Sequence, residues 1–412
     1  MKYIINAQGI LSASLEGPVA PHLALFTQRV GELGYGLDSL RKQVRIAAFF
    51  SRWLGQRAVP LPDVTCGHVA RFLRYRSRQK LLHNGDAAAL RRLIDWLHNQ
   101  GAIPAQEMPL PQLTGAERCA EAFERYLQQE RALARASIGN YVPFVRDFLK
   151  HRFGVGQVAL SRLCAADVVG FVQRQAPRLH RKRAKLMTTA LRSFLQYARY
   201  RGAVTLDLAA AVPVVANWSM TEIPRAISAD HVRQLLASID RGTPMGRRDY
   251  AVLLLLARLG LRSGEVASLE LDDLDWNAGL LSVRGKGGRR NDLPLPTDVG
   301  KAIAAYLQRG RPHSTSRRVF LRAKAPIRGF HGASGVGTIV RHSLERAGIN
   351  APTRGAHQFR HGLAAEMLRK GASLAEIGDL FGHRHPQTTM IYTKVDLKAL
   401  RSLALPWPGS VP

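Results

Sequence analysis

Cysteine is scarce in this chain of 412 residues. Its three cysteines, Cys66, Cys119 and Cys164, stand far apart, and none belongs to a CxxC pair. This spacing argues against a disulfide framework and against a zinc site built on cysteines. We therefore expect free thiols in a reducing compartment.

Long apolar runs are also missing. The most apolar stretch, YAVLLLLARLGL at 250–261, is too short to span a bilayer and contains Arg258. The N-terminal stretch MKYIINAQGILSASLEG has no sustained apolar region after its lysine, so it does not resemble a signal peptide. We expect a cytoplasmic protein with no membrane association.

Acidic residues are few relative to basic ones. The chain has 30 Asp and Glu residues against 60 Lys and Arg residues, which gives a formal net charge of +30. Because 46% of the residues are hydrophobic, we expect a globular rather than a disordered protein. So large a positive charge favours a polyanionic partner, most commonly nucleic acid, although charge alone also fits a basic surface of the ribosomal kind.

Two segments that break the helical periodicity divide the chain. They are GAIPAQEMPLPQLTG at 101–115 and VPVVANWSMTEIPRAIS at 212–228. We predict helical domains at 1–105 and 112–208, a domain of mixed structure at 220–400, and a tail at 401–412.

The two helical parts resemble each other in sequence. AAFFSRWLGQRAVPLPDVTCGHVARFL at 47–73 aligns with VPFVRDFLKHRFGVGQVALSRLCAADVVGFV at 142–172, and similar stretches follow both. The matched positions include Trp53-Leu54 with Phe148-Leu149, Val69 with Val168, Phe72 with Phe171, and Gly101 with Gly202. Because the offsets are nearly constant, we infer that 1–105 is a diverged copy of 112–208, with chance similarity between amphipathic helices as the alternative.

One segment of the second helical part is strongly basic. Residues 178–201 contain eight Lys or Arg residues and no acid. A solvated helix face usually mixes both signs of charge, so phosphate contact is the favoured explanation over a solvated face. The residues that we expect to contact DNA here are Arg178, Arg181, Lys182, Arg183, Lys185 and Arg192.

The third part combines helices with a small sheet. LLSVRGKGGRRNDLPLP at 280–296 has two extended runs around a glycine-rich turn, which is typical of a hairpin, and SLELDDLDW precedes it. The predicted fold class is therefore mainly α, with one three-stranded antiparallel sheet in the C-terminal part. Lys286 lies at the hairpin tip, with Arg289 and Arg290 nearby as further candidates for DNA contact. The turn is no P-loop, because the pattern GxxxxGK followed by Ser or Thr is absent.

An arginine and a glutamate flank a predicted helix start in LGLRSGEV at 259–266. Ser263 is expected to cap this helix, which leaves Arg262 at its mouth and Glu265 in its first turn. The pair is either a guanidinium held by a carboxylate for phosphate binding or a surface ion pair of little energetic worth.

A second arginine lies in GAHQFRHGLAAEMLRK at 355–370, a predicted amphipathic helix. Phe359 and two apolar residues at i+4 and i+8 are expected to face the core, while His357, Arg360 and His361 share the opposite face. One alternative is an ordinary polar helix face. Another is a zinc site on the two histidines, but HQFRH lacks the glutamate of HExxH and places a cation between the ligands.

The stretch FGHRHPQTTMIYTKV at 381–395 places a histidine nine residues before a tyrosine. Gly382 is expected to stop the preceding helix, with His383 just beyond it. Thr388 or Thr389 is expected to cap a last helix that carries Tyr392 near its start. A buried tyrosine needs only one hydrogen-bond partner, so a setting this rich in cations and turns suggests a chemical role.

Together these motifs resemble those of the tyrosine recombinase (phage integrase) family. The matches are Arg262 and Glu265 in the block G-L-R-x-x-E, Lys286 in the hairpin, His357 and Arg360 in H-x-x-R, His383 in L-G-H, and Tyr392 as the nucleophile. Two positions depart from the family pattern without touching a chemical role: Phe381 replaces a leucine, and Lys394 stands where histidine is frequent. The resemblance implies a catalytic domain at 220–400 and a helical, SAM-like core-binding domain at 112–208, which 1–105 precedes as an addition to a minimal family member.

The resemblance implies cleavage and rejoining of DNA through a covalent 3′-phosphotyrosine, with no metal or other cofactor. Tyr392 would attack the phosphorus while Arg262 and Arg360 hold its non-bridging oxygens. The other implied roles are hydrogen bonding to an oxygen by His383, proton removal from the phenol by His357, protonation of the 5′ oxygen by Lys286, and support by Glu265. A phenol with an ordinary pKa of about 10 is inert near neutrality, and nearby cations would favour its phenolate.

The implied partner is double-stranded DNA, with a homotetramer assembled on it and the tail SLALPWPGSVP docked on a neighbouring protomer. The implied role is site-specific recombination or integration, and the added N-terminal unit points to a mobile element. Three alternatives stay open: a type IB topoisomerase, a catalytically silent DNA-binding protein on the same scaffold, and a metal-dependent nuclease. The last lacks a convincing acidic cluster, because DDLD at 272–275 is expected to form a solvated strand edge.

Overall fold

The computed structural model describes residues 4–5, 11–12, 15–104, 113–215, 225–285, 290–383 and 385–395. Two compact units make up the chain. One is Gln106–Thr221, and the other combines Met1–Ala105 with Glu222–Pro412. The domain boundaries predicted from the sequence stay a prediction, and the tail lies outside the described residues.

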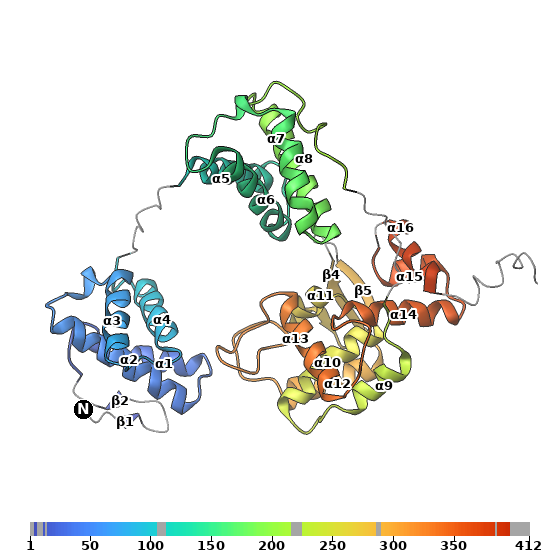
Figure 1. Ribbon diagram of the computed structural model, residues 1–412. Coiled ribbons are helices and arrows are strands. Elements are labelled where there is room, and N and C mark those ends of the chain that lie inside the picture. The colour runs from blue at the N-terminus through green and yellow to red at the C-terminus, as the bar shows by residue number, and fades with distance from the viewer. Residues whose placement is uncertain are drawn as a thin grey trace, which may run out of the picture. The chain divides into compact units, whose positions relative to one another are not determined.

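The N-terminal part is a small helical body with its own apolar core (Figure 1). Its elements are β1 (Ile4–Ile5), β2 (Leu11–Ser12), η1 (Ala20–His22), α1 (Leu23–Glu32), α2 (Leu37–Gly55), η2 (Leu61–Asp63), α3 (Cys66–Arg78) and α4 (Asp86–Asn99). Apolar residues at helical spacing turn inward, and Phe50, Trp53 and Phe72 stack together in the centre. This part therefore does not depend on its neighbours for a core.

Residues 113–215 form a second helical body, again with four α-helices and a 3-10 helix between the second and the third. Its elements are α5 (Gly115–Gln129), α6 (Arg135–Phe153), η3 (Leu160–Arg162), α7 (Ala165–Gln175), η4 (Ala176–Arg178) and α8 (Arg181–Tyr200). A capping box of Thr114 and Glu117 starts α5. Phe123, Phe148 and Phe194 are fully buried between α5, α6 and α8, so the basic face of α8 is left at the surface.

The helices of the third part pack around one apolar helix, α10 (Pro244–Arg258). Its elements are α9 (Ala229–Ala237), α10 (Pro244–Arg258), α11 (Ser263–Ser268), η5 (Leu271–Asp273), β3 (Leu274–Asp275), β4 (Leu280–Arg284), β5 (Arg290–Pro294), α12 (Thr297–Arg309), α13 (Ala333–Arg346), α14 (His357–Arg369), α15 (Leu374–Leu380), α16 (Pro386–Thr389) and η6 (Met390–Val395). Residues 251–256 of α10 are apolar on every side and almost fully buried, because both α12 and α14 pack against this helix.

The predicted sheet is present and antiparallel, in the order β3-β4-β5. Leu281 of β4 lies opposite Leu293 of β5, and both side chains are buried in the main core. The predicted fold class, mainly α with one small three-stranded sheet in the C-terminal part, is confirmed. In the described ranges, no helix is long and apolar enough to cross a membrane.

A smaller apolar cluster closes the C-terminal end of this part. Ala364 of α14, Ile377 of α15, Phe381 and Tyr392 of η6 form it. Gly382 has a φ of +59°, which suits glycine, and α15 ends just before it as the sequence predicts. This cluster fixes η6, and with it Tyr392, against α14.

Candidate active site

Arg262 stands at the start of α11 and is tied to Glu265 through both its backbone and its side chain. The Arg262 N–H donates to Oε2 of Glu265 at 2.8 Å, and Arg262 Nη1 donates to Oε1 at 2.6 Å. The prediction that Ser263 caps this helix is wrong, because Arg262 is the N-cap and Ser263 is the first helical residue. The carboxylate of Glu265 takes the capping role by reaching back to the preceding N–H. It thereby holds Arg262, whose side chain is 36% exposed.

Arg360 of α14 is 3% exposed and is fixed on three sides. Its Nη1 donates to the carbonyl oxygen of Gly260 at 2.7 Å, its Nη2 donates to that of Phe381 at 2.7 Å, and its guanidinium lies 4.0 Å from the Phe381 ring centre. Burial, together with the nearby charge of Arg262, lowers the pKa of Arg360 to about 10. The group is still a cation near neutrality. Among the described residues no carboxylate forms an ion pair with it, so an anion at this place would be strongly favoured.

Gly260 makes the approach of these parts possible. Its φ is +59°, and a Cβ there would lie 2.6 Å from the Phe381 ring. Only glycine lets the turn before α11 pass this close to Phe381 while its carbonyl oxygen accepts from Arg360. Arg262 and Arg360, 98 residues apart in the chain, are thus brought to one place.

His383 lies between Arg360 and Thr389. Its Nε2 is 3.0 Å from Nη2 of Arg360, and its Nδ1 is 2.8 Å from Oγ1 of Thr389. Because a guanidinium can only donate, Nε2 accepts and Nδ1 carries the proton. Burial and then the charges of Arg360 and Arg262 lower the pKa of His383 to about 4, so the ring is neutral near neutrality.

A short helix that was not predicted, α16, lies between His383 and η6, which carries Tyr392; α16 starts at Pro386 with His385 as its N-cap, and Thr388 and Thr389 are its last residues. Proline suits the first helical position. The predicted capping of the Tyr392 helix by Thr388 or Thr389 stays a prediction. Thr389 is 2% exposed and uses its hydroxyl on His383.

Tyr392 is 1% exposed, so its ring belongs to the core. Arg360 and Arg262 are near enough for their charges to act on its phenol. Burial raises the pKa of Tyr392, while Arg360 and then Arg262 act in the opposite direction without overcoming burial. The expected preference for phenolate is therefore not met in this state, and Tyr392 holds its proton.

Two histidines of α14 form a stack that reaches Tyr392. The rings of His357 and His361 lie 5.9 Å apart between centres and nearly parallel, and the His361 ring meets that of Tyr392 edge-on at 5.6 Å. Burial, then the charge of His357, lowers the pKa of His361 to about 4, and burial followed by the charge of Arg360 lowers that of His357. The sequence analysis places His361 on the helix face of His357 and Arg360 but assigns it no role. Its i+4 spacing from His357 was the sequence feature that could have indicated the stacking of the two rings.

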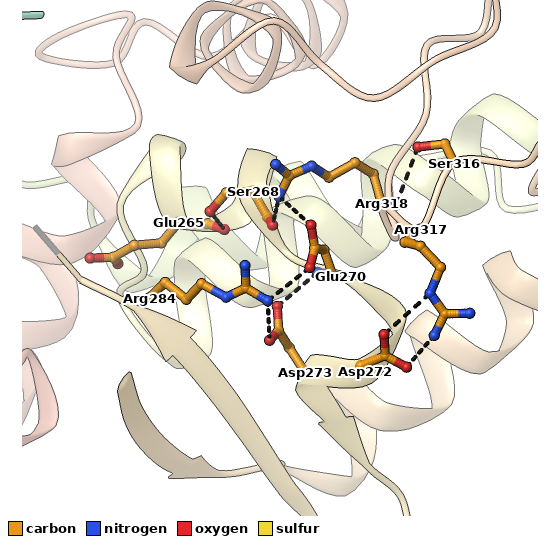
Figure 2. Close-up of polar contacts among 9 residues, drawn as sticks. All are labelled: Glu265, Ser268, Glu270, Asp272, Asp273, Arg284, Ser316, Arg317 and Arg318. Carbon is orange, nitrogen blue, oxygen red and sulfur yellow. Dashed lines mark hydrogen bonds and ion pairs between the residues drawn. The ribbon is translucent and has the colours of Figure 1, made fainter. Parts of the chain in front are cut away.

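The turn end of β4 is held by a network of acids and arginines (Figure 2). Arg284 at the end of β4 donates to Glu270 at 2.8 Å and to Asp273 at 3.2 Å, and Arg318 lies 3.4 Å from the same Glu270. The expectation that DDLD forms a solvated edge is wrong for Asp273, which is 4% exposed and belongs to η5. Lys286 and Arg289 lie outside the described residues.

The basic residues of α8 and its approach are at the surface. Arg178, Arg181, Lys182, Arg183 and Lys185 are exposed, and among the described residues no carboxylate pairs with them. Arg192 is half-buried and donates to the carbonyl oxygens of Val212 at 2.8 Å and Pro213 at 3.1 Å. Its guanidinium therefore holds the end of the unit. Arg290 is exposed at the start of β5.

A metal site finds no support in the described part of the chain. There, no three His, Cys, Asp or Glu side chains gather closely enough to hold a metal ion. The His357 and His361 pair has a buried guanidinium beside it, which would repel Zn²⁺.

Models of known families match two stretches of the chain. The model described as "Phage integrase family" matches residues 225–398, and the one described as "Phage integrase, N-terminal SAM-like domain" matches residues 120–202. The first stretch contains Arg262, Arg360, His383 and Tyr392.

Curated relatives extend this similarity to the whole chain. A Sinorhizobium fredii protein named as an integrase/recombinase is 60% identical over 410 residues, which are 99% of each chain. The tyrosine recombinase XerD of Mycobacterium tuberculosis is 32% identical over 311 residues, covering 71% of this chain and 96% of the relative.

Solved structures show the same fold. The XerH site-specific recombinase bound to a palindromic difH substrate covers 81% of this chain and 93% of its own, with a TM-score of 0.56 and 18% identity. A lambda integrase dimer bound to a core site covers 68% of this chain and 96% of its own, with a TM-score of 0.53 and 14% identity.

Proposed function

This chain belongs to the phage integrase family, and we propose that Tyr392 is the nucleophile with which it cuts and rejoins DNA. As a tyrosine recombinase it acts by transesterification, so a covalent protein–DNA bond conserves the energy of the broken phosphodiester. The Tyr392 oxygen bonds to phosphorus, the bond from phosphorus to the 5′ oxygen breaks, and the strand remains attached through its 3′ phosphate. The observation that carries this assignment is that the Tyr392 ring packs against His361 and His383, at 5.6 and 6.4 Å between ring centres, within reach of the charges of Arg360 and Arg262.

In this proposal, the scissile phosphate is the anion that the site lacks. Arg262 and Arg360 hold its non-bridging oxygens and neutralise the charge that develops in the transition state. Glu265 keeps Arg262 in place through the two hydrogen bonds described above. A bound phosphate also raises the pKa of His383, because a nearby negative charge favours imidazolium. His383 then donates to a phosphoryl oxygen from Nε2 while Nδ1 stays on Thr389.

The proton of Tyr392 has to leave as the phenol attacks. Burial lowers the pKa of His357, so its ring is uncharged near pH 7 and can accept the proton of the phenol. His361 supports the phenol ring by its edge contact and links it to His357. The 5′ oxygen requires a proton as it departs, and Lys286 supplies it, with Arg284 anchoring the strand two residues earlier.

We further propose the division into domains at 1–105, 112–208, 220–400 and 401–412, with duplex DNA against the exposed cations of α8. Exchange between two duplexes needs four cleaved strands, which favours a tetramer on DNA.

A groove beside α9 and α14, lined by apolar residues, would accept the Leu-Pro-Trp segment of a neighbour's tail. Those residues include Ile227, Val232, Leu236, Phe359 and Leu363. A chain ending near Leu400 should then bind DNA but no longer form the tetramer in gel filtration.

Capture of the covalent intermediate tests the assignment. Target DNA selected from the regions flanking the gene, prepared as a nicked suicide duplex, should give a protein–DNA adduct on a denaturing gel, and Tyr392→Phe should give none. Adduct formation should survive EDTA, unlike cleavage by a metal-dependent nuclease. Relaxation of supercoiled DNA that lacks the target would instead favour a type IB topoisomerase, and binding without any adduct would favour a silent scaffold. A mobile-element role predicts inverted repeats around the gene.

A further inference from the structure

Apart from β1, β2, η1 and η4, the N-terminal part and residues 113–215 share one order of helices: two α-helices, a short 3-10 helix and two more α-helices. The pair α2 and α6 are each 19 residues long, the short helices η2 and η3 are each three, and capping boxes start both α3 and α7. The last helix of each body, α4 and α8, ends before a glycine with φ of +68° and +69°, Gly101 and Gly202. These matches support the inference that one body is a diverged copy of the other.

Side-chain packing supports the same inference and adjusts the register. Phe50 packs on Phe72 with ring centres 5.3 Å apart, and Phe148 packs on Phe171 at the same distance. The helix bounds place Phe50 opposite Phe148, whereas the sequence comparison pairs Phe148 with Trp53. The duplicated body thus keeps the central aromatic pair of a SAM-like unit.

A basic hollow of about 470 Å³ opens on the N-terminal part, between the start of α2 and the start of α4. The charged and aromatic side chains that line it are Tyr35, Lys42, Arg45, His83, Asp86 and Arg92. Arg92 lies 4.7 Å from the centre of the Tyr35 ring and donates to Gln43. The guanidinium is therefore held in one place at the wall of the hollow.

The charges in this basic hollow are not balanced. Its one acid, Asp86, lies 3.7 Å from Arg76 and accepts the backbone N–H of His83, so its charge is already engaged. Among the described residues, no carboxylate lies within ion-pair distance of Lys42, Arg45 or Arg92. Two exposed arginines elsewhere on the same part, Arg29 and Arg52, do have acidic partners.

We propose that the basic hollow binds the sugar-phosphate backbone of duplex DNA, which makes the N-terminal part a second DNA-binding module in addition to α8. Three cations without acidic partners, on two helices, suit a polyanion better than a small ligand. Contacts from such cations to phosphates would not depend on the base sequence. The proposal rests on DNA being the substrate of this family but not on the chemistry of Tyr392. Its expected effect is tighter and more salt-sensitive binding on any sequence.

Salt dependence of binding tests the proposal in the full-length chain. Fluorescence anisotropy on a long labelled duplex, in a Tyr392→Phe background that prevents cleavage, gives affinity between about 0.05 and 0.2 M salt. Lys42→Gln with Arg45→Gln removes two exposed charges, so the slope of log affinity against log salt should become shallower by about 1.8. Affinity near 0.1 M salt should fall by about tenfold or more.

The matched control removes two exposed charges from the same part at ion-paired positions, with Arg29→Gln and Arg52→Gln, and it should keep the wild-type slope. Lys42→Arg with Arg45→Lys preserves the charges and should also keep it. Should the double variant prove unstable by circular dichroism, Lys42→Gln alone should lower the slope by about 0.9. An unchanged slope, or an equal loss in the control, overturns the proposal. Failure of the wild-type protein to form the covalent adduct would instead contradict the assignment of Tyr392 as the nucleophile, and the salt-dependence test would remain valid.

Discussion

The hydroxyl oxygen of Thr389 lies 2.8 Å from Nδ1 of His383, six residues earlier in the chain. This bond decides which nitrogen of the ring faces the site, since Nε2 is left toward Arg360 at 3.0 Å. A threonine with no place in the family's catalytic motifs therefore sets the tautomer of a histidine that has one.

Thr389→Val should slow covalent adduct formation by about tenfold or more while leaving DNA affinity unchanged, because His383 loses the partner that fixes its tautomer. Unfolding should also become easier by about 1–3 kcal/mol, since a buried ring N–H is left unpaired. Single-turnover cleavage and thermal melting measure the two effects. Thr388→Val is the matched control at an exposed neighbouring position and should behave as wild type. Equal rates for both variants would remove Thr389 from the site.

Arg360→Lys should lower the cleavage rate by about 10²–10³-fold, although the charge is kept. Lysine cannot donate in a fork to the carbonyl oxygens of Gly260 and Phe381, nor stack on Phe381 as a plane. The rate of adduct formation at saturating DNA is the measurement. Arg258→Lys, at an exposed ion pair with Asp298, is the control and should cost little. A nearly normal rate in the first variant would show that the bidentate geometry is not used.

Glu265→Gln should weaken both the helix start and the hold on Arg262. The amide still accepts the Arg262 N–H but no longer attracts the guanidinium as an anion, so we expect a loss of about 1–2 kcal/mol in unfolding free energy and a slower cleavage step. Denaturant unfolding and single-turnover cleavage check the two effects. The exposed Glu345→Gln should change neither. An unchanged cleavage rate would show that Glu265 does not hold Arg262 for the reaction.

Acidification should destabilise the free protein before its carboxylates titrate. The pKa values of His361 and His383 are lowered to about 4, while an unfolded histidine titrates near about 6.5. The unfolded chain therefore binds more protons below about pH 6.5, so stability is complete above that pH and declines as pH falls toward about 4. Thermal melting at about pH 7.5 and about pH 5 should show this decline. His361→Phe should make this decline smaller, because it removes one of the two histidines with a lowered pKa. The phenylalanine ring keeps the edge contact with Tyr392, and no hydrogen bond is lost, since Nδ1 of His361 is buried without a partner. Identical melting at both pH values in the wild type would contradict the shifts.

Much of this structure was predictable because local chemistry decided it. The pairing of the two hairpin strands, the helix stop at Gly382 and the face shared by His357, Arg360 and His361 follow from spacing and turn residues, and the structure contains all three. The approach of Arg262 to Arg360 was implied only by resemblance to a family. It depends on a glycine turn that no periodicity predicts.

Other features escaped prediction because they arise from tertiary contacts. A pattern of polar and apolar residues does not show that Tyr392 sits in a core cluster, where burial outweighs two cations in setting its pKa. Nor does a run of basic residues distinguish the exposed Arg181 from Arg192, which caps backbone carbonyls. In both cases the residue type was right and the environment decided its role.

The most direct measurement is peptide mapping of the trapped covalent adduct by mass spectrometry. We predict that the nucleotide remnant is attached through a 3′ phosphate to Tyr392, and that Tyr306→Phe, which alters another fully buried tyrosine, leaves adduct yield unchanged. A remnant on any other side chain, or an adduct that persists in Tyr392→Phe, would contradict the assignment.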